Sequence, residues 1–100
     1  MVVTYKKSTD GNTQAQREDF KAVCCAVQNF MLSLWSEGIG SKWTDGKLQQ
    51  TKEFADLVGI DTEAEKVAGI VWFGFAKGGL GEVKPKERTK GYDEVLNILP

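Results

Sequence analysis

A run of basic side chains late in the sequence is suited to binding an anion. Residues 84–90 read KPKERTK and carry four cationic side chains and one carboxylate. Lys86 and Arg88 stand two positions apart, and in an extended segment such residues project to the same side, where they can hold a phosphate. A solvated loop is the alternative. Nucleic acid is a weaker candidate ligand, because no aromatic side chain interrupts the run to stack on bases.

A glycine-rich segment in the middle of the chain is the second candidate for ligand contact. Residues 38–46 read GIGSKWTDG. Glycines let backbone N–H groups approach a flat ligand closely, and Trp43 adds an aromatic surface. The alternative is a plain connection between two elements, with no ligand role.

Several other chemistries are excluded by the composition and the spacing. The chain contains no His, which removes His-based triads and His-ligated zinc. Cys24 and Cys25 are adjacent and lack further soft ligands, so we interpret them as small buried apolar residues on a helix and expect no metal. Lys47 is followed by Leu48, which breaks the P-loop pattern, and Lys84 stands where a dinucleotide fingerprint needs its third glycine. No side chain is singled out as catalytic.

Two helices are predicted from spacing and capping residues. Apolar side chains recur at spacings of three and four over residues 17–37, and Thr13 with Gln16 fits a capping box before them. The apolar stripe is wider than that of a surface helix, so this helix needs cover on more than one side. A shorter helix is predicted to start at Thr51 and to end at Gly59.

Three extended segments are predicted around these helices. Residues 2–5 favour a short strand, and residues 39–43 favour a strand or an extended connector. Residues 67–76, VAGIVWFGFA, are apolar on both faces, which predicts a central strand covered by helices on each side. Strict alternation places Val67 and Val71 on the same face of that strand.

The chain is long enough for one small domain, and we treat residues 1–100 as part of a single α+β domain. Residues 78–100 form its basic loop and tail, with an amphipathic end over residues 92–99. Two or three strands are too few to cover a strand buried on both faces and a broadly apolar helix. We therefore expect the chain to assemble with copies of itself and part of the domain to be missing.

The charge balance restricts the partners. Thirteen basic and fourteen acidic side chains give a net charge of −1, which argues against nucleic acid or an anionic membrane as the main partner. The first residues contain no apolar signal core, and no apolar run approaches the roughly 18 residues needed to span a bilayer. We expect a cytoplasmic protein.

Five segments, taken in order, resemble the C-terminal half of the flavin-dependent nitroreductase family. The family has a long core helix with an A-x-Q-N-x-x-L pattern, a glycine-rich turn that contains Trp, a central strand and a late basic pair. The matching parts here are residues 17–20 (REDF), 25–32 (CAVQNFML), 37–46 (EGIGSKWTDG) and 72–74 (WFG), together with Lys86 and Arg88.

The resemblance implies a three-layer α-β-α sandwich that works as an intertwined homodimer with FMN at the subunit interface. By analogy, the backbone at Trp43, Thr44, Asp45 and Gly46 would lie against the isoalloxazine ring and donate N–H groups to its N5/O4 edge. Lys86 and Arg88 would hold the ribityl phosphate. The implied reaction transfers hydride from NAD(P)H through FMN to a nitroaromatic, a quinone or a similar small-molecule acceptor.

One departure from the family pattern concerns the start of the chain. Members carry an N-terminal half whose R-R-S-type segment also holds the FMN phosphate, and this sequence shows no counterpart. We therefore expect the N-terminal half of the sandwich to be missing and the flavin site to be incomplete in this chain. The alternative function is a non-enzymatic, truncated interaction module that pairs through its apolar helix.

Overall fold

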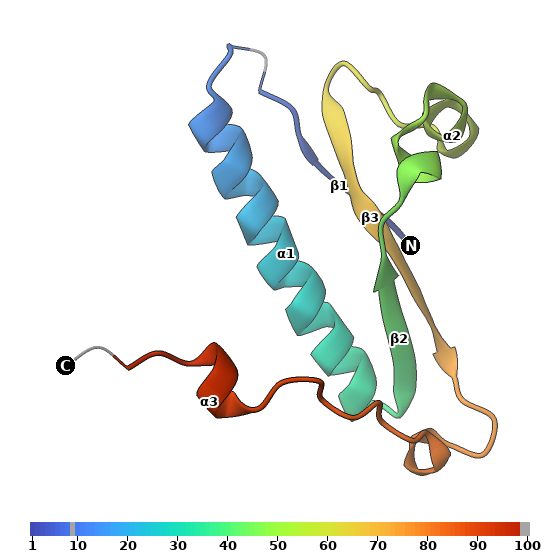
Figure 1. Ribbon diagram of the computed structural model, residues 1–100. Helices are drawn as coiled ribbons and strands as arrows, with labels where there is room; N and C mark the ends of the chain where they lie inside the picture. The colour runs from blue at the N-terminus through green and yellow to red at the C-terminus, as the bar shows by residue number, and fades with distance from the viewer. Residues whose placement is uncertain (9, 99–100) are drawn as a thin grey trace.

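The computed structural model describes residues 1–8 and 10–98 and shows an α+β arrangement (Figure 1). The described residues form six helices and strands, in the order β1 (Val2–Lys6), α1 (Thr13–Ser36), β2 (Ile39–Thr44), α2 (Lys52–Val58), β3 (Glu65–Phe75) and α3 (Tyr92–Val95). Two single-turn 3₁₀ helices, η1 (Lys47–Gln50) and η2 (Leu80–Glu82), follow β2 and β3. The α+β expectation is thus confirmed.

The three strands form one antiparallel sheet in the order β1-β3-β2, with β3 in the centre. The prediction of a central strand is therefore confirmed. The connector at residues 39–43 is a true strand, because β2 pairs with β3 from Ile39 opposite Phe75 to Thr44 opposite Ile70. As an edge strand, β2 has no strand on its other side among the described residues.

A β-bulge interrupts the pairing of β1 with β3. Val3 stands opposite Gly69, whereas Thr4 stands opposite Val67, so β3 has one extra residue at Ala68. Gly69 has a φ of +140°, a backbone conformation that favours glycine at such a bulge. The extra residue moves Val67 to the face opposite that of Gly69, so the prediction that Val67 shares a face with Val71 was wrong.

The helix α1 begins earlier than the apolar pattern indicated, and its cap is a different residue. Asn12 is the N-cap, and its side-chain oxygen accepts the N–H of Ala15 at 3.0 Å. The Thr13–Gln16 capping box was therefore wrong, since the Gln16 side chain instead accepts the N–H of Ser8 at 3.1 Å. Asparagine is among the strongest N-cap residues, so the earlier start has a local cause.

Helix α1 packs on one face of the sheet through aromatic pairs. The rings of Phe30 and Phe73 meet edge to face at 5.7 Å between centroids, and Tyr5 and Phe20 lie 5.1 Å apart. The opposite face is open near the end of β3, where the Trp72 side chain is 59% exposed. Cover of β3 by helices on both faces is therefore not present along its whole length in this chain.

Much apolar surface stays in contact with solvent. Among the described residues, the buried apolar core consists of Val27, Ala55, Ala68 and Val71. On α1, Leu32 and Trp35 are each 57% exposed. The radius of gyration is 17.2 Å, well above the roughly 13 Å of a compact domain of this length. The chain leaves open the apolar surfaces that the sequence predicted would need further cover.

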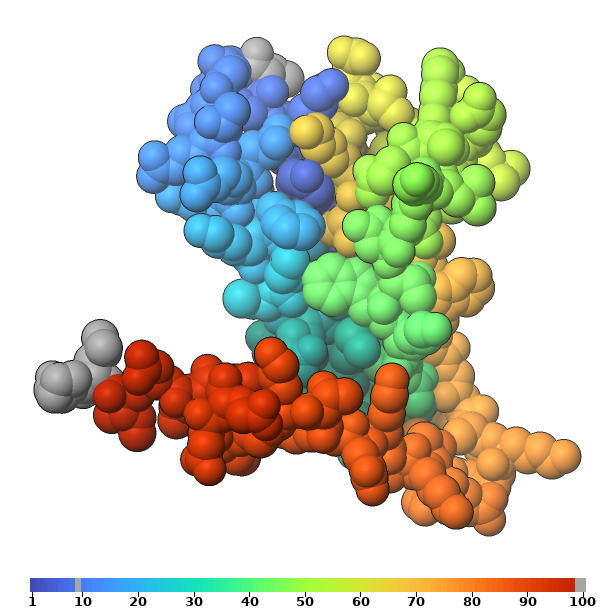
Figure 2. All heavy atoms as spheres, viewed as in Figure 1, coloured from blue at the N-terminus to red at the C-terminus, as the bar shows by residue number. Residues whose placement is uncertain are grey.

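The segment after η2 runs as an arm across the end of the molecule near the α1–β2 connection and extends beyond the body (Figures 1 and 2). It contains the short helix α3, and the predicted amphipathic end is described only as far as residue 98, with Leu99 outside the described residues. Val95 and Ile98 are both exposed. In the described ranges, none of the helices combines the length and the apolar character that crossing a bilayer requires.

Candidate functional site

Trp43 is a structural part of the sheet. It lies opposite Val71 on β3, is half-buried, and its indole N–H donates to the carbonyl oxygen of Ala68 at 3.3 Å. The ring covers Gly69, where a Cβ would collide with Trp43 Nε1. The side chain that the sequence offered as an aromatic surface is thus held against the bulge, while the backbone at this position belongs to the edge strand.

Thr44 ends β2 and fixes an exposed indole. Its hydroxyl donates to the carbonyl oxygen of Ile70 at 3.4 Å and accepts the indole N–H of Trp72 at 2.9 Å. Trp72 stands two residues from Ile70, the partner of Thr44, and therefore lies on the same face of the sheet. The pattern of the sequence did not identify Trp72 as a neighbour of this segment, because only the strand register brings the two side chains together.

Asp45 and Gly46 form an exposed turn after β2. The Asp45 carboxylate accepts the N–H of Gly46 at 2.8 Å and the side-chain amide of Gln50 at 3.1 Å. The same Gln50 amide donates to the carbonyl oxygen of Val67 at 3.5 Å. Two polar side chains therefore tie the turn back to β3.

A further side chain beside this turn has an unpaired acceptor. The side-chain oxygen Oε1 of Gln49, on η1, is shielded from solvent and has no hydrogen-bond partner among residues 1–8 and 10–98. A Cβ built on Gly46 would lie 3.5 Å from this oxygen. Gln49 was not among the residues singled out in the sequence, where two adjacent glutamines after a glycine-rich turn carry no recognisable signal.

The two predicted phosphate residues lie on the arm. Lys86 and Arg88 are exposed and fall in an irregular segment between η2 and α3. The Arg88 guanidinium stands 5.4 Å from the centroid of the Tyr92 ring, which is within cation–π range. Both cations are accessible to a solvated anion.

The two groups of predicted residues occupy opposite ends of β2. Residues 43–46 lie at its C-terminal end, toward α2, whereas the arm passes its N-terminal end (Figure 1). The start of the arm packs against the N-terminal part of β2, because the Leu80 side chain of η2 lies over Gly40. A Cβ on Gly40 would be 3.4 Å from Leu80 Cδ2. A ligand that contacts both groups in one chain must span six residues of strand, roughly 15–20 Å.

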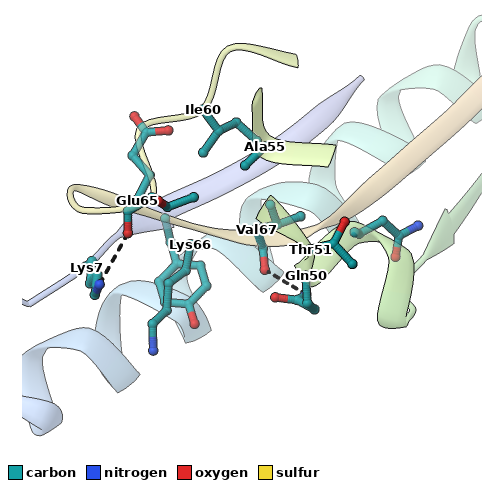
Figure 3. A pocket seen from close by; sticks show the side chains of 11 residues that line it. Lys7, Gln50, Thr51, Ala55, Ile60, Glu65, Lys66 and Val67 are labelled. Atoms are coloured by element: carbon teal, nitrogen blue, oxygen red, sulfur yellow. Dashed lines mark hydrogen bonds between the residues drawn. The ribbon is translucent and has the colours of Figure 1, made fainter. Parts of the chain in front are cut away.

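A polar cavity of about 330 Å³ lies beside η1 and the start of β3 (Figure 3). Lys7 and Lys66 lie on one side of it, and Gln50 and Thr51 lie on the other. The Lys7 ammonium group donates to the carbonyl oxygen of Thr62 at 3.2 Å. None of the six predicted site residues lines this cavity, but two of its lining residues, Gln49 and Gln50, hydrogen-bond to the turn at Asp45 and Gly46.

The described ranges show how the acidic side chains and the two cysteines are placed. No group of three or more Cys, Asp or Glu side chains there is arranged to hold a metal ion. Cys24 is half-buried and Cys25 is exposed, so the second cysteine is not the buried small residue that the sequence suggested.

Comparison with known proteins identifies the family. The model of the nitroreductase family matches residues 1–75, which include β1, α1, β2, α2 and β3. The chain belongs to the nitroreductase family. The matched residues contain the turn at residues 43–46, whereas Lys86 and Arg88 lie beyond the match.

Two relatives show how similar this chain is to known proteins of the family in sequence and in fold. The provisionally named NAD(P)H nitroreductase YfhC of Bacillus subtilis (strain 168) is 35% identical over 66 residues, which are 66% of this chain and 34% of that protein. A crystal structure of a nitroreductase-like family protein from Bacillus cereus superposes with a TM-score of 0.80 at 24% identity, over 98% of this chain and 49% of the other. The chain thus has a nitroreductase-like fold and spans about half the length of that solved relative.

Proposed function

We propose that this chain contributes to an FMN-dependent oxidoreductase that transfers hydride from NAD(P)H through the flavin to a nitroaromatic, a quinone or a similar small-molecule acceptor. The observation that carries the proposal is the family match over residues 1–75, because it includes the edge strand and the turn predicted to contact the flavin ring. The flavin supplies the redox chemistry, so the absence of His from the chain is no obstacle.

The turn after β2 offers groups that suit a flavin ring. Residues Trp43, Thr44, Asp45 and Gly46 are proposed to hold the ring through their backbone. Gly46 is extended, with φ −175° and ψ 170°, and is exposed at the end of the strand, where its N–H donates to the Asp45 carboxylate and its carbonyl oxygen accepts the N–H of Gln49. The hydrogen bonds of Thr44 and Asp45 hold the turn in place.

The arm offers the charge that a phosphate needs. We assign Lys86 and Arg88 the phosphate of FMN, since both are exposed cations and Arg binds phosphate oxygens with two parallel N–H donors. The residues proposed for the ring and the arm proposed for the phosphate lie at opposite ends of β2 (Figure 1), and this separation suits a ligand as elongated as FMN. The proposed roles of these chain residues are binding and orientation.

A homodimer is the proposed working form, with the flavin at the interface between two copies. Support comes from the apolar surface left open, including Leu32 and Trp35 of α1 and Trp72 of β3. Full burial of an exposed apolar side chain stabilises by about 1.5–3 kcal/mol. These three are a little over half exposed, so a second protomer that covered them would gain roughly half of that at each. A three-layer α-β-α sandwich of which this chain supplies one part belongs to the same proposal, since the chain covers 49% of the solved relative.

The test is flavin binding followed by turnover. The purified chain is titrated with FMN by fluorescence quenching, and NAD(P)H oxidation is then followed with a quinone or a nitroaromatic. We expect saturable binding of FMN with a dissociation constant weaker than about 1 μM, because the site in this chain is incomplete. Binding tighter than that would contradict the incomplete site. A chain that binds no FMN, and shows no FMN-stimulated oxidation of NAD(P)H, would contradict the function.

The exposed apolar face of α1 also favours the second candidate, a non-enzymatic module that pairs with another chain. Trp35 and Leu32 lie three residues apart, which places them on one side of the helix, and both are more than half exposed. This candidate predicts self-association without flavin binding, so the same titration separates the two functions.

A further inference from the structure

The indole of Trp72 is exposed, and yet its one polar atom has a partner. The side chain is 59% exposed on the sheet face opposite α1, and its N–H donates to the Thr44 hydroxyl at 2.9 Å. An indole can only donate, so the hydroxyl must direct its own proton elsewhere, and it donates to the carbonyl oxygen of Ile70 at 3.4 Å. Two residues of β3 thus hold the Thr44 side chain, one through its acceptor and one through its donor.

The peptide that follows Thr44 is oriented against the same strand. Its carbonyl oxygen lies against Gly69, where a Cβ would come within 2.6 Å of it. In a planar trans peptide the C=O and N–H groups point to opposite sides, so the N–H of Asp45 points away from β3. Among residues 1–8 and 10–98 this N–H has no acceptor, whereas the N–H of Gly46 is already donated to the Asp45 carboxylate. The Asp45 N–H is therefore available to a ligand at the end of β2.

We propose that Trp72 is a positioning residue for the flavin ring, because its hydrogen bond to Thr44 fixes the peptide whose Asp45 N–H donates to N5 of the isoalloxazine. This inference rests on the proposed function, which puts the ring at residues 43–46. In the oxidised flavin N5 accepts through a lone pair in the plane of the ring, and a hydrogen bond weakens steeply when its donor is misaligned. Trp72 acts through Thr44 and need not contact the ring.

The test compares FMN with 5-deaza-FMN, in which a C–H group replaces N5 and the acceptor is lost. Equilibrium dialysis of the purified chain with each flavin gives two dissociation constants, and their ratio measures the contact at N5 independently of turnover. We expect wild type to bind FMN roughly three- to tenfold more tightly than 5-deaza-FMN, as for one hydrogen bond between neutral groups. Trp72→Phe keeps an aromatic ring but lacks the N–H, so this preference should fall below about twofold.

The ratio of the two affinities separates positioning from a purely structural role. A variant that is only less stable loses affinity for both flavins by the same factor, so its ratio stays at the wild-type value. Phe75→Leu is the matched control, because Phe75 is an exposed aromatic residue of the same strand that lies opposite Ile39, at the other end of β2. It should leave the ratio unchanged. Thr44→Val removes the acceptor of the same hydrogen bond and should lower the ratio as Trp72→Phe does.

Each outcome decides one claim. If Trp72→Phe keeps the wild-type preference for FMN, the positioning role of Trp72 is wrong while the flavin site stands. If wild type binds the two flavins equally, the Asp45 N–H does not meet N5 and the inference is also wrong. If wild type binds neither flavin, the proposed function fails and this inference falls with it. Should Trp72→Phe fail to fold, Thr44→Val makes the same measurement, because it breaks the same hydrogen bond from the other side.

Discussion

The indole of Trp43 occupies the space that a side chain at position 69 would need. A Cβ on Gly69 would lie 2.6 Å from the carbonyl oxygen of Thr44 and 3.0 Å from Trp43 Cδ1, and it would collide with the indole nitrogen. The bulge in β3 and the ring on β2 therefore depend on each other. The ring fills the position left empty by the glycine, and its N–H satisfies the carbonyl oxygen of Ala68.

Gly69→Ala should strongly destabilise the chain. The substitution adds a Cβ at a φ of +140° and pushes it against backbone and ring atoms, which together cost about 2–5 kcal/mol. Gly74→Ala is the matched control on the same strand, because nothing lies within 4 Å of its Cβ position and its φ is not positive. Urea unfolding measures both, and an equal response of the two variants would refute the packing role of Trp43.

The hydrogen bond between Trp72 and Thr44 should couple the two strands at the predicted ring-binding end of β2. Thr44→Val removes a hydroxyl that donates to Ile70 and accepts from Trp72, so we expect a loss of about 1 kcal/mol. Trp72→Phe removes the N–H donor together with part of the ring, and the cycle below separates the two effects. In a double-mutant cycle, the loss of stability in the double variant should be smaller than the sum of the two single losses by about 0.5–1 kcal/mol. Additive losses would show that this bond contributes nothing to stability.

Asn12→Ala should destabilise α1 by about 1 kcal/mol, because it removes the side-chain oxygen that accepts the N–H of Ala15. Thr13→Ala serves as the control, since Thr13 is the first helical residue and alanine has the higher helix propensity. Thermal unfolding followed by circular dichroism compares the two. A larger loss for Thr13→Ala would restore the capping box that the sequence pattern favoured.

Much of the fold followed from local patterns, whereas the details of the site did not. The period of the apolar residues predicted α1 and the central strand, and Gly59, with φ +77°, ends α2 as its residue type indicated. The bulge at Ala68 was not predicted, because one extra residue in the strand changes the face of Val67 without changing the apolar pattern of the sequence. The choice of Asn12 over Thr13 depended on one hydrogen bond.

The site residues show the same limit. The glycine-rich segment identified residues 43–46 as a unit, and the structure shows the contacts that hold them. The partners Trp72 and Gln50 come from strand register and from a 3₁₀ turn, and neither leaves a spacing signal in the sequence. For Lys86 and Arg88 to contact the same ligand as residues 43–46, the chains must assemble in a particular way, and the spacing of residues in one sequence does not define that assembly.

The Ser8 hydroxyl and the Asn12 N–H hold the pKa of Asp10 below its ordinary value of 3.8, through hydrogen bonds of 2.6 and 2.9 Å. Because the pKa of Asp10 is lower in the folded chain, ionised Asp10 stabilises the fold at pH values above the ordinary pKa of 3.8. This stabilisation is lost as the pH falls through the folded pKa. Ser8→Ala should raise the pKa of Asp10, as measured by NMR titration of its carboxyl carbon. Ser33→Ala on α1 is the control and should leave that pKa unchanged.

Arg88→Ala should weaken FMN binding by about 1.5–3 kcal/mol, the cost of a lost hydrogen bond to a charged group. Riboflavin lacks the phosphate, so its affinity should stay the same in the variant. Lys84→Ala, in the same basic run, controls for a general loss of positive charge and should have a smaller effect that disappears at high salt. Equal losses for FMN and riboflavin would remove Arg88 from the phosphate site, because only a contact with the phosphate distinguishes the two ligands.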